Sequence, residues 1–292
     1  MGKYYTGCAV WAFKDWVGEF YPAGSQPRDF LRLYCDRMTA VEGNTTFYSI
    51  PSSNTIARWA DTMPADFRFC PKVPRIFSHQ GPLYPHLEAT TQLATALTPL
   101  GHRLGPFLLQ LPPSYGPTMA ADLERFLSGW PHKFPLAVEV RHLSWFREPH
   151  AQRLHQMLQN LGIGRALLDT RPIYGAMATG NPDPQEGSQR RKPEVPLQPQ
   201  VSADFTFIRY IAHPEAAHND AYLDVWRQRL RTWLSQDLTV YFFAHCPQEK
   251  YSPHIARRVY HQLQAGNASL PPLKWDILAS QEQASPSQLS LF

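Results

Sequence analysis

Eight short runs of apolar residues, each bounded by glycine or proline, recur along the chain. They are rich in β-branched and aromatic residues, which is typical of buried strands. The runs predict strands at Tyr4–Cys8, Ala40–Gly43, Phe67–Lys72, Phe107–Leu111, Leu136–Val140, Arg165–Asp169, Phe205–Tyr210 and Thr239–Phe243.

Segments with helical periodicity lie between most of these runs. In one of them Leu154, Met157, Leu158 and Leu161 recur at i, i+3, i+4 and i+7, which predicts an apolar stripe facing a sheet. Alternating strands and helices predict a (β/α)8 TIM-barrel-like single domain of α/β class, since an open doubly wound sheet would need a glycine-rich first turn. Helices are expected at Pro27–Asp36, Ser53–Asp61, His86–Thr98, Met119–Ser128, Pro149–Asn160, Ala221–Leu234 and Pro253–Gln264.

Two segments depart from this regularity. Residues 178–200 contain five prolines and the basic run Arg190-Arg191-Lys192, so a long loop is expected where the sixth crossover helix should stand. Such a loop lies at the catalytic face of a barrel, either as a basic lid or as a solvated insertion. Residues 276–292 are expected to form a flexible tail, which leaves 1–275 for the barrel.

Most of the apolar runs end in a polar or charged residue. Helices cover both faces of a parallel sheet, so charge at the ends of its strands costs free energy unless it serves a site. Side-chain alternation places Glu139 with Arg141, Leu167 with Asp169, and Phe207 with Arg209 on one side of their strands. We therefore expect these polar residues to point inward and to converge at one end of the barrel: Glu42, Lys72, Gln110, Glu139, Asp169 and Arg209.

This predicted mouth suits an anionic ligand. Lys72, Arg141 and Arg209 are the candidate phosphate ligands, with Asn44 and Gln110 beside them. Four residues are candidate catalytic residues. Glu42, Glu139 and Asp169 would hold water or a divalent metal, which is the candidate cofactor. His245 would act as an acid or a base. The alternative is a salt-bridge network that satisfies itself and binds nothing.

Aromatic residues follow three of the predicted strands. Trp11, Tyr48 and Trp145 stand where they can stack on a base or a sugar of a ligand. The same residues can equally cap the hydrophobic core, and the pattern does not decide between the two roles.

Composition narrows the class of protein. With 43% hydrophobic and 18% charged residues, the 292-residue chain can bury a large core. A net charge of +4 is compatible with anionic partners but does not by itself indicate nucleic-acid binding. The four cysteines form no Cys-x-x-Cys pair, and no run approaches a membrane span, so we expect a cytoplasmic protein without a membrane partner.

Five ordered segments of the sequence resemble the YecE-like family, also called domain of unknown function 72. The resemblance covers nearly the whole chain and implies a TIM-barrel-like fold. It also implies cleft residues at Glu42, Asn44, Lys72, Gln110, Glu139, Arg141 and Asp169, but no established reaction. The segments are Gly7 to Trp16, Val41 to Tyr48, Phe67 to Pro74, Leu109 to Pro113 and Val138 to His142.

The last five residues resemble the pentapeptide with which bacterial replication and repair proteins bind the sliding clamp. The sequence is Gln288-Leu289-Ser290-Leu291-Phe292. The motif suits such a partner. The amide of Gln288 can bond to the rim of a pocket, and the side chains of Leu289, Leu291 and Phe292 can fill an apolar pocket. In the alternative, the three apolar side chains fold back onto the barrel.

Together these features predict a protein that binds or processes a phosphorylated ligand of nucleic-acid type. The leading hypothesis is a metal-assisted phosphoester hydrolase recruited to the sliding clamp. The alternatives are a non-catalytic nucleic-acid or nucleotide binding module, and a sugar-active barrel with Glu42 and Glu139 as its carboxylate pair.

Overall fold

The computed structural model describes residues 2–186, 191–266 and 270–284. Every strand predicted from the apolar runs is present, and the bounds differ by at most two residues at either end. The strands are β1 Tyr4–Cys8, β2 Ala40–Gly43, β3 Arg68–Pro71, β4 Phe107–Gln110, β5 Leu136–Glu139, β6 Gly164–Asp169, β7 Phe205–Ile211 and β8 Thr239–His245.

The strands are all parallel and lie in two hydrogen-bonded sheets. One sheet has six strands in the order β1-β8-β7-β6-β5-β4, and the other pairs β2 with β3. Isolated bridges and single hydrogen bonds join the two sheets, among them a bridge between Lys72 and Leu108 and a hydrogen bond from the Thr39 N–H to the Thr6 carbonyl. The predicted parallel α/β architecture is therefore confirmed, whereas the eight strands do not form one continuous ladder.

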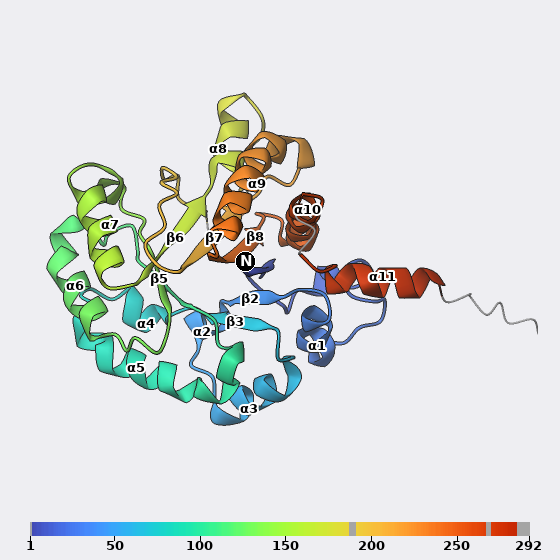
Figure 1. Ribbon diagram of the computed structural model, residues 1–292, viewed down its shortest axis with the longest axis horizontal. Coiled ribbons are helices and arrows are strands. Elements are labelled where there is room, and N and C mark those ends of the chain that lie inside the picture. Colours follow the sequence, from blue (N-terminus) through green and yellow to red (C-terminus); the bar gives the residue numbers. More distant parts are fainter. Residues whose placement is uncertain (1, 187–190, 267–269, 285–292) are drawn as a thin grey trace, which may run out of the picture.

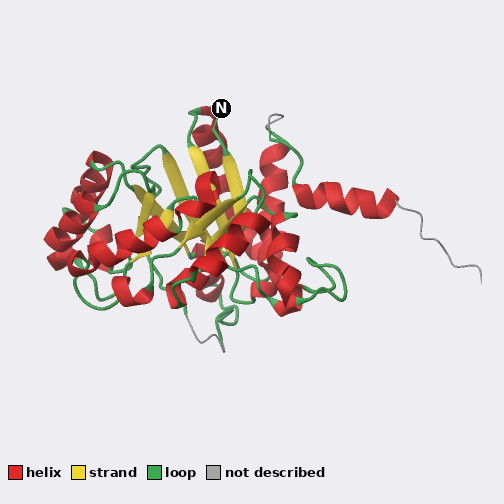
Figure 2. Ribbon diagram, turned by 90° about the horizontal axis from the view of Figure 1, so that it is seen from below, coloured by secondary structure: helices red, strands yellow, loops and turns green. Residues whose placement is uncertain are grey.

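Helices surround the strands on the outside (Figures 1 and 2). In α7 the predicted stripe is confirmed, because Leu154 and Leu158 are buried and Met157 and Leu161 pack against the core. The helices are α1 Phe30–Cys35, α2 Thr45–Tyr48, α3 Ser53–Thr62, α4 Arg75–Ser78, α5 Leu87–Ala96, α6 Ala120–Gly129, α7 His150–Asn160, α8 Arg171–Ala178, α9 Asp220–Ser235, α10 Ser252–Gln264 and α11 Lys274–Ala284.

Four helices lie where the sequence pattern predicts none: the short α2 and α4, which follow β2 and β3, and the longer α8 and α11. α8 directly follows β6 and begins with Arg171-Pro172, since proline is favoured in the first turn of a helix. α11 includes the predicted boundary between barrel and tail at residue 276, and it projects from the body of the protein (Figure 1). None of the described helices is long and apolar enough to cross a bilayer.

The inner faces of the strands form two layers. The layer nearer the amino ends of the strands is apolar. On most strands the next inward-facing residue, two positions further along the chain, is polar, and these residues form the second layer nearer the carboxyl ends. The apolar layer contains Ala40, Cys70, Leu108, Ala137, Ala166, Phe207 and Phe243. The layer above it contains Glu42, Lys72, Gln110, Glu139, Arg209 and His245.

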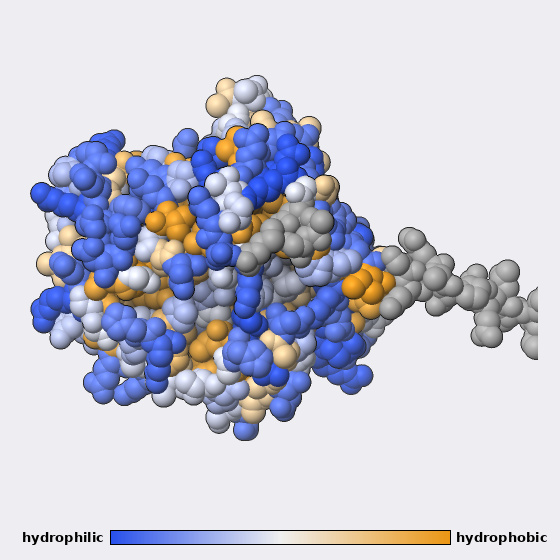
Figure 3. All heavy atoms as spheres, in the orientation of Figure 1, coloured by the Kyte–Doolittle hydropathy of each residue, from blue (hydrophilic) through white to orange (hydrophobic). Residues whose placement is uncertain are grey.

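The outer surface is mainly hydrophilic on the face shown in Figure 3, where hydrophobic residues form separate patches. The polar layer between the strands is not part of that surface, since its residues are buried inside the ring of helices.

Candidate functional site

The centre of the polar layer is an arginine held between two glutamates. Arg209 Nε and Nη2 donate to the Glu42 carboxylate at 2.7 and 2.9 Å, and Nη1 donates to Glu139 Oε2 at 2.6 Å. All three residues are almost fully buried. We call Glu42, Glu139, Arg209 and the residues bonded to these carboxylates the ionic cluster.

Three further side chains complete the ionic cluster. Arg141 Nε and Gln110 Nε2 both donate to Glu139 Oε1, at 2.7 and 2.8 Å. His245 Nε2 lies 3.1 Å from Glu42 Oε2. These residues come from the ends of five different strands or the positions just after them, so only the packing of the two sheets against each other brings them together.

The electrostatics keep both glutamates ionised. Burial alone would raise the pKa of Glu42, but the charge of Arg209 and the contact with His245 outweigh it and hold that pKa well below its ordinary value. In the same way burial opposes ionisation of Glu139, yet Arg209 and Arg141 lower its pKa to about 2. The carboxylates in turn raise the pKa of Arg209 in spite of burial.

His245 behaves differently from its neighbours. Burial lowers its pKa to about 4 and outweighs the attraction of Glu42. The imidazole is therefore neutral at neutral pH, and its contact with Glu42 assigns the proton to Nε2, which donates to the carboxylate.

Lys72 is the unusual member of the polar layer. It is only 6% exposed, and among the residues that the structure describes its ammonium makes no hydrogen bond or ion pair. The nitrogen lies 4.0 Å from the centre of the Phe47 ring. Burial first, and then the nearby Arg209, lower the pKa of Lys72 well below its ordinary value. This side of the layer thus has an uncompensated cationic group.

Arg141 lies on the same side and is the least buried charge of the ionic cluster, with a side chain 15% exposed. Only its Nε contacts a carboxylate, so within the described part of the chain its two terminal nitrogens remain unbonded. His79 is close to both cations: burial, Lys72 and Arg141 lower its pKa to about 4. The region between Lys72 and Arg141 can accept an anion.

Two residues near the ionic cluster were not predicted. Lys192 lies in the proline-rich loop, where Tyr174 donates to its carbonyl at 2.6 Å and its own N–H donates to Gln185 Oε1 at 2.7 Å. Glu249 follows β8 in the short helix η8, Glu249–Tyr251. The basic run in the loop was the available signal for Lys192, whereas nothing in the sequence distinguished Glu249 from other loop carboxylates.

Asp169 corrects the predicted convergence. Its carboxylate accepts from Arg171 Nε and Nη2 and from Trp226 Nε1 at 2.7–2.8 Å, on the outer side of β6. The register pairs Leu168, not Asp169, with Arg209. The inward positions of β6 are the apolar Ala166 and Leu168, so the polar residue of this strand does not mark its inward face as it does on the neighbouring strands.

The predicted aromatic rim is present only in part. Tyr48 is 58% exposed and its ring contacts Phe47. Trp145 is buried and donates to the Tyr115 carbonyl, and Trp11 packs edge-on against Trp59, so both belong to the core. Asn44 donates to the Ala9 carbonyl at 3.0 Å and ties the loop after β2 to the end of β1.

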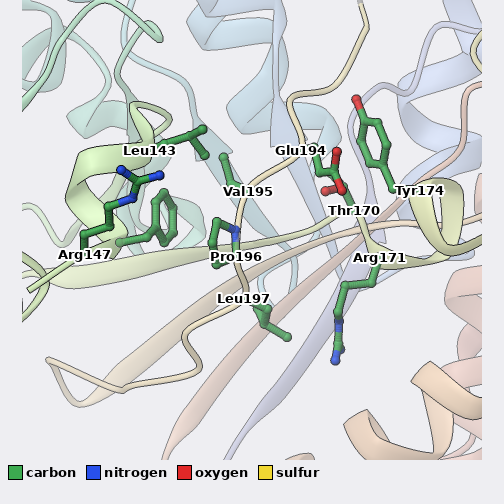
Figure 4. Close-up of a pocket in the computed structure, with 10 residues that line it drawn as sticks. Leu143, Arg147, Thr170, Arg171, Tyr174, Glu194, Val195, Pro196 and Leu197 are labelled. Atoms are coloured by element: carbon green, nitrogen blue, oxygen red, sulfur yellow. The ribbon is translucent and has the colours of Figure 1, made fainter. Parts of the chain in front are cut away.

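A pocket of about 480 Å³ lies beside the ionic cluster but is not formed by it. Figure 4 shows Leu143 and Arg147 on one side, Tyr174 and Glu194 on the other, and the segment with Val195 between them. Val195 packs with Leu168 and Ile211 at the ends of β6 and β7, and no residue of the ionic cluster lines this pocket.

The predicted metal ligands Glu42, Glu139 and Asp169 do not form a common ligand set. Among the described residues, the one such group is His213, Glu215 and His218. The Glu215 N–H donates to His213 Nδ1 at 3.0 Å, which in a neutral ring leaves the proton on Nε2. That tautomer has no lone pair for a metal, so this group does not fit an ion in this conformation.

The motif Gln288–Phe292 lies outside the described residues. Its role as a partner-binding segment is therefore still a prediction.

Comparisons with known proteins agree with the fold. Residues 5–277 match the family described as "Protein of unknown function DUF72". The UPF0759 protein YecE of Escherichia coli K12 is 32% identical over 289 residues, which cover 99% of each chain, and the protein of strain O157:H7 matches to the same extent.

Solved structures are similar as well. A DUF72 family protein from Thermotoga maritima aligns with a TM-score of 0.65 and 24% identity, over 91% of this chain and 98% of that one. A DUF72 family protein from Enterococcus faecalis aligns with a TM-score of 0.65 and 17% identity, over 92% and 97%. The resemblance to the YecE-like proteins is thus confirmed over almost the full length, and the chain belongs to the DUF72 family.

Proposed function

We propose that the carboxyl ends of the strands bind a phosphorylated ligand of nucleic-acid type. The observation that carries this proposal is the buried ammonium of Lys72, which is not paired with any carboxylate in the described part of the chain. Keeping this group charged without a partner costs on the order of 1–3 kcal/mol or more, which is why burial lowers its pKa, and a phosphate beside it would offset that cost.

Arg141 supplies the second contact. Its guanidinium is close enough for its charge to act on Lys72, and its two terminal nitrogens form a planar pair of donors that suits two oxygens of one phosphoryl group. Glu139 and Gln110 orient Arg141 rather than contact the ligand. The proposal treats the strands as one closed (β/α)8 barrel in the cytoplasm, with the ligand entering at its carboxyl end.

The geometry favours binding over the two catalytic alternatives. A metal-assisted hydrolase needs carboxylates that can turn toward an ion, whereas Glu42 and Glu139 are saturated by arginine contacts. A glycosidase needs one carboxylic acid with a raised pKa, but the pKa of both glutamates is lowered. If the protein is an enzyme, His245 with Glu42 is the candidate acid–base pair.

Replacing Arg141 by Ala is expected to weaken binding of a nucleotide or a short single-stranded oligonucleotide by about 1.5–3 kcal/mol, because a charge-assisted contact is lost. Lys72→Met should weaken the same binding without lowering the melting temperature, since it removes a buried cationic group without a carboxylate partner and keeps an unbranched side chain only one atom shorter. Calorimetry at low salt measures both affinities.

Arg28→Ala is the matched control, because the Arg28 side chain is 85% exposed and lies in η2, Pro27–Asp29, away from the ionic cluster. The control should bind like the unchanged protein. Equal affinities for the Arg141 and Arg28 variants would show that Arg141 does not contact the ligand.

We further propose that the terminal pentapeptide Gln288–Phe292 docks on the sliding clamp. The support is the motif itself and the position of α11, which leads away from the body of the protein (Figure 1). The peptide alone should bind at about micromolar strength, as expected for a short segment that is ordered on docking.

Changing Leu291 and Phe292 to Ala should weaken clamp binding more than about tenfold and leave the melting temperature unchanged. A Ser290→Ala variant serves as control, since Ser290 supplies no apolar contact. Lower thermal stability together with no clamp binding by the unchanged chain would instead favour an apolar latch on the barrel.

A further inference from the structure

The pocket shown in Figure 4 is not used by the proposed phosphate site. Its volume of about 480 Å³ lies within the range of about 300–1,000 Å³ that is typical of small-molecule sites. It lies at the carboxyl ends of the strands, between the residues that follow β5 and those that follow β6. Half of its ten lining residues are apolar: Leu143, Phe146, Val195, Pro196 and Leu197.

Hydrogen bonds hold the proline-rich segment 193–198 against both walls of this pocket. On one wall, the Thr170 hydroxyl donates to the Pro193 carbonyl at 3.2 Å. On the other wall, Gln198 Nε2 donates to the Phe146 carbonyl at 3.0 Å. These contacts make the pocket rigid, and a rigid pocket loses little conformational entropy when a ligand binds.

Two charged side chains of the pocket are available to a ligand. Arg147 lies on one side of the pocket and Glu194 on the other (Figure 4). Both residues are exposed, and within the described ranges neither side chain makes a hydrogen bond or an ion pair. The two oxygens of Glu194 can therefore accept from a ligand with neighbouring N–H donors, and the guanidinium of Arg147 can stack on a flat ring.

A buried arginine lies against Phe146, one of the lining residues. The Arg165 guanidinium is 5.4 Å from the centre of the Phe146 ring, and Nη2 donates to Gln198 Oε1 at 2.9 Å. Arg165 is 3% exposed and lines a nearly filled cavity of about 10 Å³, which shares Phe146 with the larger pocket. Burial lowers its pKa to about 10, so it stays charged at neutral pH. A cation over one face of an aromatic ring makes the other face a better partner for an electron-rich ring.

We propose that this pocket binds the nucleobase of the phosphorylated ligand. The inference rests on the proposed phosphate site, since it assigns the part of the same ligand that Lys72 and Arg141 leave unbound. The base stacks on Phe146, and Glu194 accepts hydrogen bonds from its edge. Guanine fits this pocket best, because its N1–H and N2–H donors are adjacent and match the two oxygens of one carboxylate.

The pocket and the phosphate site are close enough for one nucleotide. Arg141 stands two residues before Leu143, so their Cα atoms are at most about 7 Å apart. The turn between them is fixed, since His142 Nδ1 accepts from the Ser144 N–H at 3.2 Å. The side chains of Arg141 and Leu143 are both partly open to solvent, so a ligand can reach each of them. A ribose then bridges the base in the pocket and the phosphate at Arg141.

Calorimetry with guanosine monophosphate, ribose 5-phosphate and guanosine separates the two parts of the site. We expect guanosine monophosphate to bind about tenfold or more tightly than ribose 5-phosphate, because the base adds a stacking contact. Phe146→Leu keeps an apolar side chain but removes the ring. It should abolish most of this difference and leave the affinity for ribose 5-phosphate unchanged, a pattern that general loss of structure would not give.

Glu194→Gln should weaken guanosine binding by about tenfold, because a charged acceptor is lost. Arg141→Ala should leave guanosine binding unchanged, since guanosine has no phosphate. Glu186→Gln is the matched control: Glu186 is exposed in the same loop and does not line the pocket. This control should bind all three compounds like the unchanged protein. Because Glu194 is exposed, its variant also provides the reading if Phe146→Leu folds poorly.

Three results would count against the assignments in different ways. Equal affinities for guanosine monophosphate and ribose 5-phosphate, both dependent on Arg141, would overturn the base pocket alone. Equal affinities for guanosine and its monophosphate, with no binding of ribose 5-phosphate, would refute the phosphate site and support the base pocket. If the unchanged protein binds none of the three compounds at low salt, both assignments are wrong.

Discussion

Replacing Arg209 by Met is expected to lower the free energy of unfolding by about 3–5 kcal/mol. The substitution keeps an extended side chain but removes the guanidinium that bonds Glu42 and Glu139. Both carboxylates are completely buried, so they would remain as neighbouring like charges with too few donors. Urea unfolding at pH 7.5 measures the loss.

Two further variants test whether this loss of stability comes from the buried carboxylates that Arg209→Met leaves unpaired. Arg32→Met removes an exposed pair with Asp36 and should change stability by less than about 0.5 kcal/mol. Adding Glu42→Gln and Glu139→Gln to Arg209→Met should recover part of the loss, because no buried charge is then left unpaired. A loss below about 1 kcal/mol in the single Arg209 variant would mean that the ionic cluster is more hydrated than its burial indicates.

Stability should fall in two successive pH ranges as the solution is acidified. The pKa of His245 is about 4 in the folded protein and 6.5 in its ordinary state, so the unfolded chain binds the proton first and stability is lost as the pH falls from 6.5 to 4. For Glu139 the ordinary value of 4.5 falls to about 2, so its contribution is present above pH 4.5 and is lost below it. A tenfold change in proton affinity is worth about 1.4 kcal/mol. Each of the two groups is therefore expected to lower the free energy of unfolding by about 3 kcal/mol over its own pH range.

His245→Gln tests the first range, because glutamine can still donate to Glu42 but does not titrate. Urea unfolding at pH 7.5 and at pH 4.5 should show a smaller loss in this variant than in the unchanged protein. His132→Gln, at an exposed position in the loop before β5, should keep the original pH dependence. The same loss in all three proteins would mean that His245 is already protonated in the folded state.

The strands and most of the inward-facing polar residues follow from local sequence alone. An apolar run of four to seven residues between glycine or proline is enough to specify a strand, and strict alternation then specifies a face. For this reason Glu42, Glu139 and Arg209 could be assigned to one cluster, although 167 positions separate Glu42 from Arg209. The resemblance to the YecE-like family independently implied Glu42 and Glu139, but not Arg209.

Local sequence also left several assignments undetermined. On β6 the inward positions Ala166 and Leu168 are apolar and the charged residue stands on the outer face, so the expectation that the polar residue points inward assigned Asp169 to the wrong side. Trp145 and Trp11 follow strands as ligand-binding aromatics do, but helix packing decides that they belong to the core. Pairing between the two sheets depends on a few contacts at Thr39 and Lys72, which no local pattern specifies.

The edge of the site near Lys192 and Glu249 was decided by tertiary structure alone. Lys192 lies in the proline-rich loop and Glu249 in the short helix η8, where neither strand alternation nor helical periodicity operates, and each backbone accepts a hydrogen bond from a side chain distant in sequence, Tyr174 or Trp16. The charge states of the site residues were also decided by the tertiary structure, because the loss of hydration depends on which atoms are packed around a titratable group. Residue type alone predicts a charged Lys72 and a His245 that titrates near neutrality, whereas burial lowers the pKa of both.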